Sequence, residues 1–92
     1  MAEARRIGRS AVEKQLATCA NFVSGVESIY GWKGKVERAR EVLMLMKTTA
    51  GRVRELEREV KRMHSYDVPE FVVVPIVAGS REYLDWIREN AK

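Results

Sequence analysis

Several residue types and features that mark particular protein classes are rare or absent in this chain. It has one cysteine, so no internal disulfide can form, which fits a reducing compartment. It has no apolar run near the ~18 residues that a transmembrane helix requires, and its first residues lack the apolar stretch of a secretory signal. We therefore expect a cytoplasmic protein without a membrane span; a longer form targeted to an organelle stays open.

The sequence also lacks the usual signatures of enzymes and RNA-binding modules. The single histidine, His64, has no evident serine, cysteine or aspartate partner with which to form a catalytic triad. Glycine-rich phosphate-binding loops are absent, and the segment GWKGKVE lacks the aromatic continuation of an RNA-recognition signature. The sequence therefore predicts a protein that is not an enzyme.

The positive charge has two interpretations. The formal net charge is +4, and Arg54, Arg58 and Arg62 fall on one face of a helix, as in some nucleic-acid-binding surfaces. Acidic residues are interleaved with them, however: Glu57 lies four positions before Lys61, in the arrangement of a solvated helix surface. We therefore expect no nucleic-acid partner.

The composition is that of a folded domain. Hydrophobic residues make up 46% of the 92 residues and charged residues 33%, which predicts one globular domain over residues 1–92. A chain of this length buries only about 60–65% of the surface that its unfolded form exposes. Because such a core is marginal, oligomerisation would help to stabilise it.

Apolar periodicity and turn residues predict three helices and three strands. They are a helix over residues 3–17, a strand over 19–32 with a bulge at Gly25, a strand over 35–46, a helix over 53–63, a strand over 71–77 and a helix after Ser80. Lys33-Gly34 is expected to form the hairpin turn between the first two strands. Thr48-Thr49 is expected to supply the hydroxyl cap of the second helix. This order predicts an α+β fold, a two-layer sandwich with an antiparallel sheet.

Two of these strands are apolar on both faces, namely residues 42–46 and 71–77. Two main helices can cover only one face of the sheet. Since monomers rarely expose so much contiguous apolar surface, we expect the chain to associate with itself through the sheet. Met44 and Met46 are expected to pack in the core, although thioethers are also copper(I) ligands.

Four blocks of sequence resemble, in order, the CutA divalent-cation-tolerance family. They are LATCANFVSGVESIYGWKGKVE, EVLMLMKTT, HSYDVPEFVVVPI and YLDWI, and the similarity runs from about residue 3 to residue 90. The resemblance implies a ferredoxin-like domain that forms a tight homotrimer through its sheets. It also implies tolerance to divalent metals, especially copper, without catalysis.

The chain departs from the family pattern at its start. The family begins with a strand that precedes the first helix and is central in the sheet, and the opening MAEARRIGRS already belongs to that helix. Three outcomes stay open: the neighbouring strands close together, another subunit fills the space, or the natural protein has residues upstream of Met1. We favour the last outcome, so that the domain is CutA-like with the first strand missing.

The candidate metal ligands are His64, Glu70 and Cys19. Imidazole and carboxylate ligands suit Cu²⁺ and Zn²⁺, and His64 and Glu70 match the family's HPYEVPE segment. Cys19 is a soft ligand that matches the cysteine of the family's AACVN. The structural alternatives are that His64 simply ends a helix, stabilised by the dipole and local carbonyls, and that Cys19 is a small buried hydrophobe.

Two functions therefore compete. The first is a trimeric protein that binds divalent metal, copper in particular, in the response to metal ions. The second is a PII-like trimeric signalling or scaffold module that binds a small anion or a protein partner; it is supported by fold analogy alone.

Overall fold

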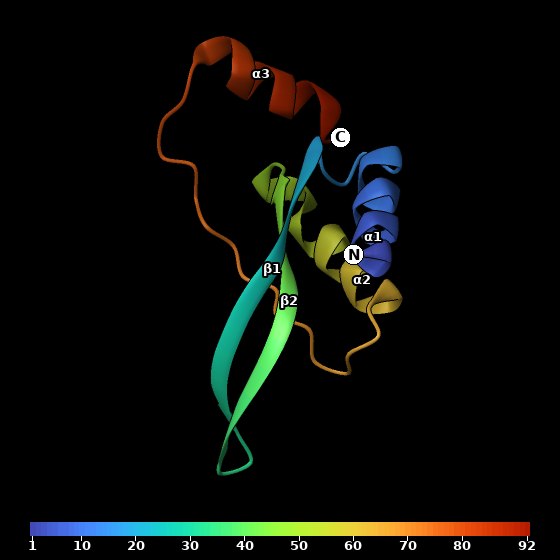
Figure 1. Cartoon of the computed structure of the whole chain (residues 1–92). Helices are drawn as coiled ribbons and strands as arrows, with labels where there is room; N and C mark the ends of the chain where they lie inside the picture. Colours follow the sequence, from blue (N-terminus) through green and yellow to red (C-terminus); the bar gives the residue numbers. More distant parts are fainter.

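The structure, a computed structural model that describes all 92 residues, contains three α-helices and one hairpin (Figure 1). The elements follow in the order α1 (Ala2–Glu13), β1 (Cys19–Trp32), β2 (Lys35–Lys47), the 3-10 turn η1 (Ala50–Arg52), α2 (Val53–Met63) and α3 (Arg81–Asn90). Helices α1 and α2 lie side by side next to the start of the hairpin, and α3 lies beyond it (Figure 1). The predicted α+β class is confirmed. No helix is both long and apolar enough to cross a membrane.

Helix α1 ends at Glu13, four residues before its predicted end. Gln15 adopts a left-handed backbone with φ 59°, and its N–H donates to the Val12 carbonyl. The N–H of Leu16 donates to the Ala11 carbonyl at 2.9 Å, which completes the hydrogen-bond pattern of a Schellman motif. The chain therefore turns sharply after the helix, and Leu16 and Ala17 fold back into the core.

The hairpin agrees with its prediction. Strands β1 and β2 pair antiparallel from Cys19 opposite Lys47 to Trp32 opposite Lys35, with an irregularity between Val23 and Val26. Gly25 lies in that irregularity with φ 74°, which confirms the predicted bulge. Lys33 and Gly34 both have positive φ, as a two-residue type I′ turn requires.

The strand predicted over residues 71–77 does not form, and this prediction was wrong for the chain as described. The sheet has two strands only, and the backbone of residues 67–79 makes no backbone–backbone hydrogen bond. Val72, Val74 and Val77 are 71%, 79% and 91% exposed. In Figure 1 the segment runs as an extended trace past the hairpin to α3. The segment has the sequence of a strand, but it forms none, because a strand requires a hydrogen-bonded neighbour and this segment has none.

A small core lies between the two main helices and one face of the hairpin. It is formed by Ile7, Ala11, Leu16, Ala17, Leu56 and Val60, with Met44, Met46, Met63 and Phe71 packed against it. The predicted core positions of Met44 and Met46 are thus confirmed. On the opposite face of the sheet Val23, Leu43 and Leu45 are about half exposed.

Thr48 and Thr49 do not form the predicted hydroxyl cap of α2, and other hydroxyl groups hold α3 in place. Neither threonine caps the helix that follows; Thr48 Oγ1 instead donates to the Leu16 carbonyl at 2.7 Å. Thr18 Oγ1 donates to the Ile87 carbonyl at 2.7 Å, and the predicted cap Ser80 accepts from the Tyr83 N–H. The end of α3 is thereby tied to the start of β1.

A buried carboxylate joins the two main helices. Glu59 on α2 has a side chain that is 8% exposed, and it accepts hydrogen bonds from Arg62 at 2.8 Å, Ser10 at 2.6 Å and Lys14 at 2.9 Å. Hydrogen bonds from Arg62, and then from Ser10 and Lys14, hold the pKa of Glu59 far below its ordinary value of 4.5. Burial is thus compensated by three donors, two of them cationic.

We expect Glu59→Gln to lower the free energy of unfolding at pH 7 by about 1.5–3 kcal/mol, the range for hydrogen bonds to a charged group. Because the folded pKa lies below the unfolded one, the stabilisation is full well above pH 4.5 and is lost as the pH falls below that value. Urea unfolding from pH 7 to pH 3 measures both effects. The matched control is Glu57→Gln, whose partner Lys61 is exposed. Equal losses in the two variants would contradict the role of Glu59.

Candidate functional site

His64 ends α2, as the structural alternative stated. It has an extended backbone, and its N–H donates to the Val60 carbonyl at 2.9 Å. Ring atom Nδ1 accepts the backbone N–H of Tyr66 at 3.0 Å, and the two rings lie 4.7 Å apart. Because Nδ1 is occupied as an acceptor, the neutral imidazole carries its proton on Nε2. The side chain keeps 24% of its surface exposed.

The carboxylate beside His64 comes from the other end of the sequence. Glu3 in the first turn of α1 accepts the backbone N–H of Ser65 and the Ser65 hydroxyl, the latter at 3.0 Å. Its Oε1 lies 3.7 Å from His64 Nδ1. The hydrogen bond from the Ser65 backbone is the main cause that lowers the pKa of Glu3. Sequence reasoning missed Glu3, since no local pattern joins residues so far apart.

Glu70, the predicted carboxylate ligand, follows the buried Pro69 and is exposed. It makes no side-chain hydrogen bond or ion pair within the chain, so no contact holds its carboxylate toward His64. The carboxylate that the fold places against His64 is therefore that of Glu3.

Cys19 has different surroundings. It begins β1 opposite Lys47, whose Nζ lies 3.8 Å from the Cys19 sulfur, and the Asn21 Oδ1 lies 3.5 Å from that sulfur. The thiol is half-buried. No three histidine, cysteine, aspartate or glutamate side chains of the chain lie close enough together to hold a metal ion. His64, Glu70 and Cys19 are thus not assembled into one site.

Comparison with known sequences identifies the family. The sequence model of the CutA1 divalent ion tolerance protein family matches residues 1–90. The divalent-cation tolerance protein CutA of Thermus thermophilus is 51% identical over 87 residues, which cover 95% of this chain and 84% of that protein. The chloroplastic CutA protein of Arabidopsis thaliana is 39% identical over 88 residues, which cover 96% of this chain and 48% of that protein.

Solved structures agree. The CutA1 structure from Thermus thermophilus superposes with a TM-score of 0.96 at 49% identity, covering 98% of this chain and 87% of that one. A structure described as the periplasmic CutA of Archaeoglobus fulgidus has a TM-score of 0.96 at 41% identity, covering 100% and 89%. A structure described as a PII-like CutA protein from Nostoc has a TM-score of 0.88 at 36% identity, covering 96% and 86%.

These findings define an α+β protein of the divalent-cation tolerance class. The chain belongs to the CutA1 divalent ion tolerance protein family. The four blocks that carried the resemblance are therefore correctly interpreted.

Proposed function

We propose that this chain is a subunit of a homotrimeric, non-catalytic CutA protein that binds divalent metal, copper in particular, and acts in the cytoplasm in the response to metal ions. The observation that carries the proposal is the junction of α1 and α2, where the one imidazole of the chain lies 3.7 Å from a carboxylate. Both groups are ligands for Cu²⁺ and Zn²⁺. Membership in a family named for divalent ion tolerance supports it.

The donor set fits part of a coordination shell. His64 would bind the ion through Nε2, which requires its proton to move to Nδ1. The Nδ1–H would then donate to the Glu3 carboxylate, and the Tyr66 N–H would lose its present acceptor. Glu3 would then orient the imidazole while Glu70 or water supplies oxygen ligands. Cys19, a soft donor at the start of β1, would bind copper separately from His64. A bound divalent ion would supply positive charge, and these donors would balance that charge.

We expect His64→Ala to weaken Cu²⁺ binding by about tenfold or more, since a lost ligand costs at least as much as a lost supporting residue. Isothermal titration of copper into metal-free protein measures this. Glu3→Gln and Glu70→Gln should weaken binding less, and the exposed Glu82→Gln serves as control. Affinity unchanged by His64→Ala would return the segment HSYDVPE to a purely structural role.

The outer face of the sheet supports the trimer. Val23, Leu43 and Leu45 lie half exposed opposite the helix layer, and Trp32 is exposed near the hairpin turn. Apolar side chains left exposed on one face of a sheet are typical of an interface between subunits. Light scattering coupled to size exclusion at micromolar concentration should give three times the mass of one chain. A monomer would contradict the proposal.

The second candidate function is that of a PII-like signalling module. The specific observation in its favour is the likeness to the Nostoc protein that is described as PII-like. Calorimetric titration of the protein with common nucleotides measures nucleotide binding and separates this function from metal binding. Saturable nucleotide binding without copper binding would favour the module.

A further inference from the structure

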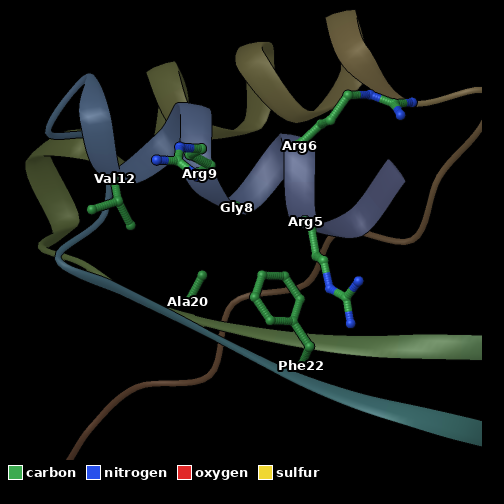
Figure 2. Close-up of a pocket in the computed structure, with 7 residues that line it drawn as sticks. All are labelled: Arg5, Arg6, Gly8, Arg9, Val12, Ala20 and Phe22. Carbon is green, nitrogen blue, oxygen red and sulfur yellow. The ribbon is translucent and has the colours of Figure 1, made fainter. Parts of the chain in front are cut away.

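A groove on the helix side of the hairpin has no role in the functions above. It lies between α1 and the start of β1, with a volume of about 510 Å³ (Figure 2). Its floor is apolar and its rim is cationic. Sites that hold small organic molecules typically combine such an apolar floor with a few polar groups and have volumes of ≈ 300–1,000 Å³.

The floor depends on Gly8. A Cβ at this position would lie 2.7 Å from Phe22 Cζ and 3.1 Å from the Ala20 Cβ. Because Gly8 has no side chain, the Phe22 ring can lie directly under the helix, and Val12 closes one end of the floor (Figure 2). The ring is half-buried, so the part of its surface that stays exposed can contact a flat ligand at the edge of the helix.

The rim carries arginines on one side of the helix. Arg5 and Arg9 are spaced i, i+4 and share a helical face. Arg5 reaches from α1 toward β1 and lies beside the Phe22 ring, whereas Arg6 points away from the strands (Figure 2). Arg5 has no ion-pair partner, and Arg9 has only a long contact of 3.4 Å to the largely exposed Glu13. Both guanidinium groups are thus free to bind a ligand.

We propose that the groove between α1 and β1 binds a small anion that carries a flat apolar body. Arg5 and Arg9 would hold a phosphate or carboxylate group, since guanidinium matches both in bidentate geometry. Phe22, Ala20 and Gly8 would take the flat body against the floor. The groove lies on the helix side of the sheet, so a trimer formed through the opposite face leaves it open. The proposal deepens the second candidate function by giving a small anion a site.

Phenyl phosphate is the probe, because it combines both halves of the ligand. Inorganic phosphate lacks the ring and benzyl alcohol lacks the charge. In ¹⁵N-labelled protein we expect phenyl phosphate to shift the amide signals of α1 and of residues 20–22, with an affinity at least fivefold above that of either half-probe. Equal affinity for phenyl phosphate and inorganic phosphate, or shifts confined to other regions, would overturn the proposal.

Two variants test the residues. The double substitution R5Q/R9Q should weaken phenyl phosphate binding at least tenfold, whereas R54Q/R81Q removes the same charge from exposed positions and should leave it unchanged. Phe22→Leu should lower the affinity for phenyl phosphate while that for inorganic phosphate stays constant. Equal losses in the two double variants would show non-specific attraction and refute the site. Nucleotide binding at another place would refute the groove as the anion site, but it would leave the second candidate function standing. The outcome of the copper titration does not depend on either result.

Discussion

Replacing Ile7 by alanine is expected to lower the free energy of unfolding by about 2–5 kcal/mol, the range for large-to-small substitutions in a core. Ile7 is 1% exposed and is the largest fully buried side chain of the chain. It packs in a core of only six buried residues, so few neighbouring side chains can move to fill the cavity that the substitution leaves. Against a typical total of 5–15 kcal/mol, such a loss is a large fraction of the stability.

Ile29→Ala provides the matched control, because it removes the same atoms from a side chain that is 66% exposed. Its effect should stay within about 0.5 kcal/mol, as for most surface positions. Chemical unfolding of both variants at equal protein concentration measures the difference. If both variants lose the same stability, the core does not lie between the helices and the hairpin, or Ile29 is buried by assembly.

Supplying a strand to the sheet is expected to raise the thermal midpoint by roughly 10–20 °C, since 1 kcal/mol shifts the midpoint of a domain this size by about 4–8 °C. The segment over residues 71–77 is extended, apolar and without backbone partners. Because this segment is largely exposed, its unpaired backbone groups meet water, and each hydrogen bond formed with a new strand would add about 0.5–1.5 kcal/mol. A strand that lies beside this segment would both satisfy these groups and cover its valines.

The experiment fuses an apolar extended segment of about seven residues, with a short turn, ahead of Ala2. A fusion of the same length with alternate residues replaced by proline is the control, because proline cannot donate to a ladder. Calorimetry gives the midpoint, and hydrogen exchange shows whether the amides of residues 71–77 become protected. An unchanged midpoint with unprotected amides would show that the two-stranded sheet is complete.

Local interactions account for the elements that could be predicted from the sequence. Apolar residues at helical spacing determine α1 and α2, and Lys33-Gly34 with the alternating flanks determines the hairpin, including its bulge at Gly25. These features require only residues that are close in sequence, such as a glycine where φ must be positive. The family resemblance likewise followed from contiguous blocks, and it was confirmed.

Features that depend on distant parts of the chain were decided only by the tertiary structure. Residues 71–77 have the pattern of a strand, but a strand exists only beside a hydrogen-bonded neighbour, and none lies there. Glu3 meets His64 and Ser65, and Glu59 meets Ser10 and Lys14, because α1 packs against α2. The sequence by itself thus determined the family, the helices and the hairpin. Only the packing of α1 on α2 and β1 decided which charges meet and where Gly8 opens the groove, because these contacts join residues that no local pattern relates.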